Sequence, residues 1–196
     1  MRRARPSRRW AALAAYTALV YAAIPFTGEL GLAFLRTTVG QWVFGPGLVL
    51  IVVVGATGVL VWLQRRGAPR WAYALIGITG GAYLTTLHSL AVRPLERIHL
   101  PEYGVMAWLA WLAVRGHRTP AWLAYVAAVV ITAALGLGEE LIQHVVPGRF
   151  FDWQDVRLNA LSGVLGLLVL AAMRSGEGGL LGSSAPRPEA SSARSS

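Results

Sequence analysis

Two short segments hold most of the residues whose side chains could do chemistry. They are residues 96–103 (ERIHLPEY) and 138–163 (GEELIQHVVPGRFFDWQDVRLNALSG). Their carboxylates, imidazoles, guanidiniums and amides can bind a polar ligand or act as general acids and bases. In the second segment Glu140, Gln143 and His144 are spaced i, i+3 and i+4, which predicts one polar face on a helix.

The same spacing recurs a few residues later. Pro147 and Gly148 predict a turn, after which Asp152, Asp155 and Asn159 share the opening face of the next helix. A purely structural interpretation also exists: Asp152 caps that helix, and Asp155 completes an arrangement like a capping box. Both interpretations place the residues together at one helix end.

These patterns define our candidate site residues. The ligand-binding candidates are Arg97, His99, Glu102, Tyr103, Glu140, Gln143, Arg149, Asp155 and Asn159. The catalytic candidates are Glu140, His144 and Asp155. Thr85, Thr86 and His88 are expected to approach the same recess. The alternatives are that Arg97 or Arg149 forms a structural ion pair with an outer carboxylate and that His144 is solvated.

The sequence favours neither a metal nor a cofactor. Glu140, His144 and Asp152 lack the ligand spacing of known zinc helices, so we expect no metal site and no cofactor. The chain contains neither a serine nucleophile elbow nor a phosphate loop. It has no cysteine, which excludes disulfides and thiolate ligands.

Composition indicates the elements that position these residues. Hydrophobic residues make up 55% of the 196 residues and charged ones 14%, which is typical of membrane proteins. We predict an all-α, polytopic transmembrane bundle of about six helices. The predicted helices are residues 10–25, 42–64, 71–92, 102–114, 121–146 and 156–173. Arg8 and Arg9 precede an Ala-rich run as in some signal peptides, and cleavage there would leave five helices.

Arginines indicate the orientation of the bundle. Thirteen of the 18 fall at the ends that alternate with the N-terminus, whereas seven of the nine acidic residues fall at the opposite ends. The positive-inside rule therefore puts both termini in the cytoplasm and the polar segments outside. The net charge is +9, but the basic residues are distributed between apolar runs and form no single basic face. We therefore expect no nucleic-acid partner.

The chain divides into three parts. Residues 1–9 form a basic cytoplasmic N-terminus, 10–173 the transmembrane helical domain, and 174–196 a disordered cytoplasmic tail rich in Gly, Ser, Pro and Ala. Within the helical domain, Gly163 and Gly166 are expected to allow close packing between helices.

The two polar segments resemble the VanZ-like family of bacterial membrane proteins. Glu96, Arg97, His99 and Tyr103 match one family motif. The longer signature is matched by Glu140, Gln143, Pro147, Arg149, Asp155, Asn159 and Gly163. The resemblance covers residues 96–170 and implies a multi-pass protein of the bacterial cytoplasmic membrane, related to one linked with resistance to the glycopeptide teicoplanin.

Three functions are compatible with these patterns. The leading hypothesis is an envelope protein whose outer recess binds a lipid-linked precursor or a glycopeptide, with Arg97 and Arg149 meeting anionic groups; membrane lipids are its other expected partners. The second is an intramembrane hydrolase or transferase that uses Glu140 or His144 beside Asp155. A transporter ranks last, because only His88 is a candidate ionisable group near mid-membrane.

The absence of cysteine makes the predicted orientation testable. Single Gln154→Cys and Arg66→Cys variants can be labelled in intact cells with a membrane-impermeant thiol reagent. We expect Gln154→Cys to be labelled and Arg66→Cys to be labelled only after permeabilisation. The reverse pattern would overturn the orientation.

Overall fold

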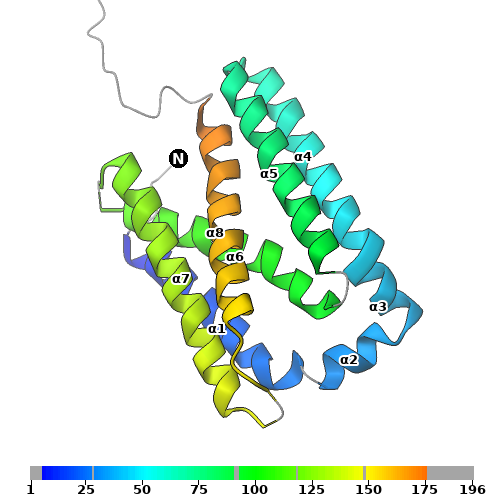
Figure 1. Cartoon of the computed structure of the whole chain (residues 1–196). Coiled ribbons are helices and arrows are strands. Elements are labelled where there is room, and N and C mark those ends of the chain that lie inside the picture. The colour runs from blue at the N-terminus through cyan, green and yellow to red at the C-terminus, as the bar shows by residue number, and fades with distance from the viewer. Residues whose placement is uncertain (1–5, 28, 91–92, 118, 148, 176–196) are drawn as a thin grey trace, which may run out of the picture.

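The protein is built from helices joined by short connections. The computed structural model describes residues 6–27, 29–90, 93–117, 119–147 and 149–175, and no strand occurs among them. The helices are α1 (Pro6–Thr27), α2 (Glu29–Leu35), α3 (Thr38–Trp42), η1 (Val43–Gly47), α4 (Leu48–Arg65), α5 (Arg70–Ser89), η2 (Pro94–Ile98), α6 (His99–Arg115), α7 (Ala121–Val145) and α8 (Trp153–Arg174). Figure 1 shows their arrangement. Most of the proposed tail, residues 176–196, and residues 1–5 of the basic N-terminus lie outside the described residues.

Each predicted apolar stretch overlaps one long helix. Residues 42–47 of the second stretch, however, fall in α3 and η1, and residues 91–92 of the third lie outside the described residues. Helices α1, α4, α5, α6, α7 and α8 each contain at least 17 residues. The sequence did not predict α2 and α3, which lie between the first two long helices. Gly45 has non-helical torsion angles just before Pro46, because a proline lacks the amide hydrogen and clashes with the preceding turn.

Three helical segments are long and apolar enough to cross a membrane: Thr38–Arg65, Ala121–Val145 and Trp153–Arg174. The first of these exposes large apolar side chains along α4, including Leu50, Ile51 and Val54, each at least 60% exposed. A contiguous apolar surface of this kind suits contact with lipid far better than contact with water.

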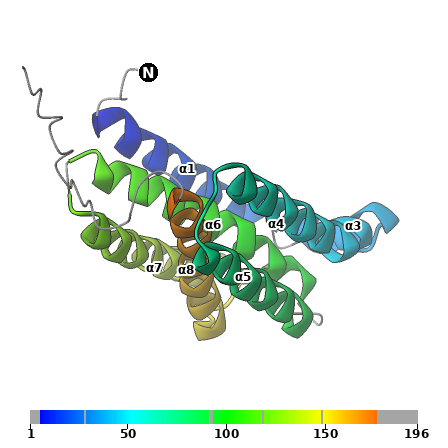
Figure 2. The same cartoon turned by 90° about the horizontal axis from the view of Figure 1, so that it is seen from above.

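Helix α6 is the centre of the bundle. It packs against α1, α7 and α8, whereas α4 and α5 form a pair that meets the rest mainly through α8. Figure 2 shows α6 between α1 and α8, with α4 and α5 to one side. The buried positions of α6 include Ala107, Ala110 and Ala113, whose small side chains let neighbouring helices approach.

Two glycines of α8 permit its close contact with α6 and α7. A Cβ atom on Gly166 would lie 2.7 Å from Cα of Gly104, and one on Gly163 would lie 2.8 Å from Cγ2 of Thr132. The predicted close-packing role of Gly163 and Gly166 is therefore confirmed.

Several arginines lie at the end of the bundle away from the acidic residues, although other arginines lie among the acidic residues. Arg9 of α1 donates to the carbonyl of Leu112 near the end of α6 (3.0 Å), and the Arg174 guanidinium lies 4.8 Å from the Trp111 ring centre. Six acidic residues lie near the opposite end, around η2, the start of α6 and the α7–α8 connection: Glu96, Glu102, Glu139, Glu140, Asp152 and Asp155. The six-span count and the sidedness remain predictions.

The Gly104–Gly166 contact predicts the effect of adding one methyl group. Gly166→Ala should destabilise the folded protein by about 1–3 kcal/mol, because backbone atoms of α6 would have to move. Gly77→Ala is the matched control, since a Cβ there meets nothing within 4 Å. Thermal unfolding midpoints in detergent measure both, and an unchanged midpoint for Gly166→Ala would contradict this packing.

Candidate functional site

A recess of about 820 Å³ lies between α1, α2, η2, the first turn of α6, the end of α7 and the start of α8. One wall is apolar and comes mainly from α1 and α2. The other wall is ionisable and comes from η2, α6, α7 and the α7–α8 connection. Its charged and titratable residues are Arg93, Glu96, His99, Glu102, Glu139, Arg149, Asp152 and Asp155. The recess is thus amphipathic.

A chain of hydrogen bonds supports the ionisable wall. The hydroxyl of Tyr103 on α6 donates to Oε2 of Glu139 on α7, and Nε2 of Gln143, one turn later, donates to Oε1 of Glu139 (3.1 Å). Arg149 Nε then donates to Gln143 Oε1 at 3.1 Å. Tyr103, Glu139 and Gln143 are all at most 5% exposed. The arrangement fixes the position of the Arg149 guanidinium at the rim.

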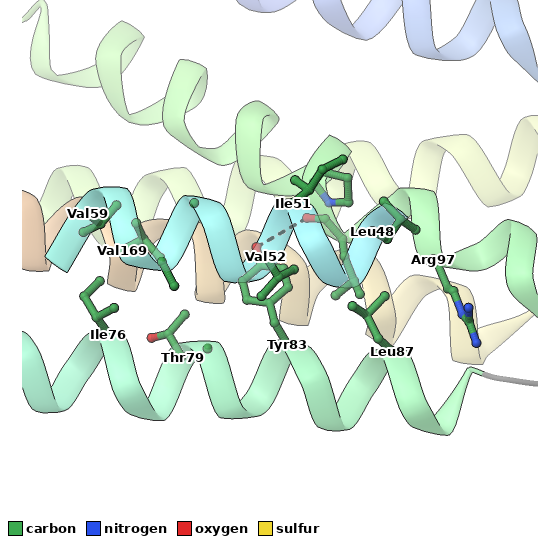
Figure 3. Close-up of a pocket in the computed structure, with 15 residues that line it drawn as sticks. Leu48, Ile51, Val52, Val59, Ile76, Thr79, Tyr83, Leu87, Arg97 and Val169 are labelled. Carbon is green, nitrogen blue, oxygen red and sulfur yellow. Dashed lines mark hydrogen bonds between the residues drawn. The ribbon is translucent and has the colours of Figure 1, made fainter. Parts of the chain in front are cut away.

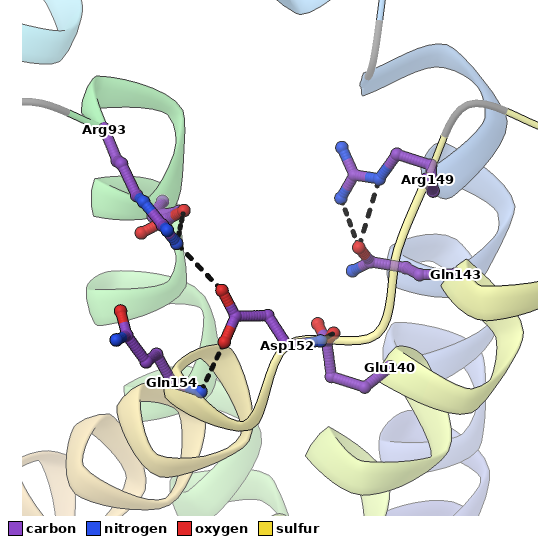
Figure 4. Close-up of polar contacts among 7 residues, drawn as sticks. Arg93, Glu140, Gln143, Arg149, Asp152 and Gln154 are labelled. Atoms are coloured by element: carbon purple, nitrogen blue, oxygen red, sulfur yellow. Dashed lines mark hydrogen bonds and ion pairs between the residues drawn. The ribbon is translucent and has the colours of Figure 1, made fainter.

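The local sequence explains why Arg149 returns over α7. Helix α7 ends at Val145, two residues before Pro147, and Val146 is extended. A proline ring disfavours the helical conformation for the residue before it, so the helix ends there and the chain turns away. Figure 4 shows Arg149 directed back toward Gln143.

Glu140 anchors the same connection. It is fully buried, and its Oε2 accepts the backbone N–H of Asp152 at 3.0 Å. In the predicted capping box the side chain of Asp155 would accept the backbone N–H of Asp152. Glu140 accepts that N–H instead, so this part of the prediction is wrong. Asp152 itself caps α8 as predicted, because its Oδ1 accepts the N–H of Gln154 at 2.7 Å.

Arg93 links η2 to the start of α8. Its guanidinium lies 2.9 Å from Oδ2 of Asp152 and 3.0 Å from Oε1 of Glu96. The hydrogen bond from Arg93 lowers the pKa of Asp152, and the same two carboxylates raise the pKa of Arg93. The link therefore persists at neutral pH and weakens only as acid protonates Asp152. Figure 4 shows Asp152 between Arg93 and Gln154.

The structural ion pair predicted for Arg97 or Arg149 is not formed. Among the described residues neither guanidinium lies within ion-pair distance of a carboxylate. Arg149 donates to Gln143, and Arg97 donates to the carbonyl of Phe44 at 2.5 Å. The outer arginine that does form ion pairs is Arg93, which was not a predicted site residue.

Five of the nine ligand-binding candidates line the recess: His99, Glu102, Gln143, Arg149 and Asp155. His99 Nδ1 lies 3.6 Å from Glu102 Oε2, and Asp155 has one buried carboxylate oxygen without a hydrogen-bond partner. The unbonded oxygen matters because buried polar atoms are normally hydrogen-bonded. Within the described residues this oxygen is therefore an unsatisfied acceptor beside the recess.

The remaining candidates lie elsewhere. Tyr103, Glu140 and Asn159 are buried and are not among the lining residues, while Arg97 lines a separate apolar groove. His144 is exposed and does not line the recess. Thr85 and His88 on α5 are also exposed, and Thr85, Thr86 and His88 are not among the residues that line the recess. The prediction that these three residues approach the recess is therefore wrong.

Four ionisable lining residues were not in the candidate set, and the apolar wall was not predicted. The four are Arg93, Glu96, Glu139 and Asp152. The i, i+3 spacing of Arg93 and Glu96 and the i, i+4 spacing of Glu139 and Gln143 were available signals. Nothing in the pattern indicated that α1 and α2 would face them, since that depends on the tertiary fold.

The fold and the recess define a helical protein of membrane type with one amphipathic site. The chain belongs to the VanZ family: the VanZ/LLP1 family model matches residues 48–174, which takes in α4 and α5 as well as the two polar segments. Comparison with curated proteins and with solved structures gave no match.

The buried Tyr103–Glu139 hydrogen bond predicts a specific sensitivity. Tyr103→Phe should lower the stability by about 1–3 kcal/mol, because it leaves a buried carboxylate oxygen without its donor. Tyr125→Phe is the control, since the Tyr125 hydroxyl is buried and has no hydrogen-bond partner among the described residues. Equal unfolding midpoints for the two variants would show that the Tyr103 bond contributes nothing.

Proposed function

We propose that the protein spans the bacterial cytoplasmic membrane several times and binds an amphiphile of the cell envelope in its outer recess. The membrane location is supported by the three span-length apolar helices, the apolar exposed face of α4 and the family. The outward direction is supported by the arginines at the opposite end. In this arrangement the recess opens at the outer surface.

The lining favours a particular ligand chemistry. Five carboxylates, two arginines and one histidine surround the recess, so its ionisable wall suits a head group rich in hydroxyl or amino groups. The apolar wall, which includes Ile24, Leu32 and Phe34, suits a hydrocarbon or aromatic portion. A lipid-linked envelope precursor or a glycopeptide of the teicoplanin kind combines these features.

The observation that carries this proposal is the state of Arg149. Arg93 is already paired with two carboxylates, whereas Arg149 is held by the neutral amide of Gln143. A guanidinium fixed in place without a carboxylate at ion-pair distance among the described residues can bind an anionic group at little cost in ordering. Arg149 therefore meets the anionic group of the ligand, and Arg97 does not take part.

The proposal predicts a charge-dependent affinity. Arg149→Gln should weaken binding of teicoplanin or of a purified undecaprenyl-linked precursor by about tenfold, the loss of one charge-assisted hydrogen bond. Arg149→Lys should retain part of the affinity. Arg157→Gln is the matched control, because Arg157 is exposed near the same end and does not line the recess.

Binding is measured with each purified protein in detergent, after thermal unfolding has shown that the variants are folded. Teicoplanin susceptibility of a sensitive Gram-positive host, at matched membrane levels, tests the resistance role separately. If wild type binds neither probe, or if Arg149→Gln binds as well as wild type, the proposed binding role is wrong.

The alternative function is an intramembrane hydrolase or transferase. Two of its catalytic candidates are poorly placed, because Glu140 is buried against the Asp152 N–H and His144 is exposed outside the recess. Glu140→Gln keeps the shape and removes the charge. Loss of turnover with intact binding in that variant would favour the enzyme.

A further inference from the structure

A second cavity lies on another side of the bundle, between α4 and α5. It has a volume of about 250 Å³, and α6 and α8 contribute Leu100 and Val169 to its lining. Figure 3 shows the lining side chains following α4 and α5 from Val59 and Ile76 to Leu48 and Leu87. Nearly all of them are aliphatic. We call this cavity the α4–α5 groove.

Two glycines keep the groove open. Gly55 and Gly80 line it from opposite helices, and a Cβ atom on either would meet nothing within 4 Å. Leu48 and Val59 are eleven residues apart on α4, which corresponds to about 16 Å along the helix. The groove is therefore long, and its volume of about 250 Å³ is several times too small for a helix of this length, whose diameter is about 10 Å. These dimensions suit a linear hydrocarbon chain.

The groove also has polar groups without internal partners. Thr79 is 1% exposed, and no described residue forms a hydrogen bond with its hydroxyl. Arg97 lies at the outer end of the groove beyond Leu87 (Figure 3). Its Nη1 donates to Phe44, its Nε is buried with no partner, and no described carboxylate neutralises it. The positive charge of Arg97 thus lies at one end of the apolar α4–α5 groove.

We propose that the α4–α5 groove binds one acyl chain of an anionic phospholipid from the surrounding bilayer, with the lipid phosphate at Arg97. Apolar length along the helices and a cation at one end are complementary to the two parts of such a lipid. The site is separate from the recess, which Arg97 does not line. The inference rests on the membrane location and not on the identity of the recess ligand.

The test uses the full chain in phosphatidylcholine vesicles that contain phosphatidylglycerol with a photoactivatable diazirine in one acyl chain. Gly80→Leu fills the groove, and Gly81→Leu is the matched control, because Gly81 is adjacent, equally unobstructed and outside the lining. Both changes favour the helix equally. We expect labelling of Val52 and Thr79 to fall about tenfold or more in Gly80→Leu, which corresponds to a tenfold loss of lipid affinity. In Gly81→Leu the labelling should persist.

The head-group assignment is tested with Arg97→Gln. Wild type should label more strongly from phosphatidylglycerol than from phosphatidylcholine carrying the same diazirine chain, and Arg97→Gln should lose that preference. Arg149→Gln should leave groove labelling unchanged, which separates this proposal from the recess.

Three outcomes would overturn the inference. Equal labelling of Val52 and Thr79 in Gly80→Leu and wild type would show that the groove is empty of lipid. Equal labelling of wild type by phosphatidylglycerol and phosphatidylcholine would show that the lipid phosphate does not bind at Arg97. Cross-links between two protein copies through the groove residues would assign the groove to a second copy of the chain.

Discussion

The buried carboxylate of Glu139 is the constraint on which the rest of the site depends. A carboxylate at the end of a membrane-type helix is costly unless donors surround it. Its donors come from two directions, Tyr103 on α6 and Gln143 one turn further along α7. Because Gln143 uses its amide N–H for Glu139, its oxygen remains for Arg149. Satisfying one buried charge thus ties two helices together and orients the arginine at the rim.

Small residues make that arrangement possible. The Tyr103 hydroxyl reaches Glu139 only because α6 and α7 lie close together, and α6 approaches α8 closely enough for Gly104 to contact Gly166. Gly136 has a similar role opposite Asn159, whose Cβ would lie 2.8 Å from an added Cβ. In a membrane, where lipid tails compete equally for apolar contacts, close packing and buried hydrogen bonds supply the association between helices.

Three of the arginines at the polar end, Arg93, Arg97 and Arg149, have different surroundings and hence different uses. Arg93 is neutralised by Glu96 and Asp152 and holds η2 against α8. Arg149 faces the amphipathic recess, and Arg97 faces the α4–α5 groove. Sequence proximity does not predict this division, since Arg93 directly precedes η2 and Arg97 lies within it, four residues apart, and yet they face different cavities.

The sequence by itself determined the helical class, the approximate positions of the long helices, the cap at Asp152 and the family. These follow from local properties: hydrophobic runs, helix spacing and ordered motifs along one stretch of chain. Tertiary structure alone decided that α1 and α2 form the apolar wall, that Arg97 leaves the recess, and that Glu140 holds the Asp152 N–H instead of facing a ligand. Each depends on which helix faces packed together, and a pattern of period 3.6 residues identifies a face without identifying its neighbour.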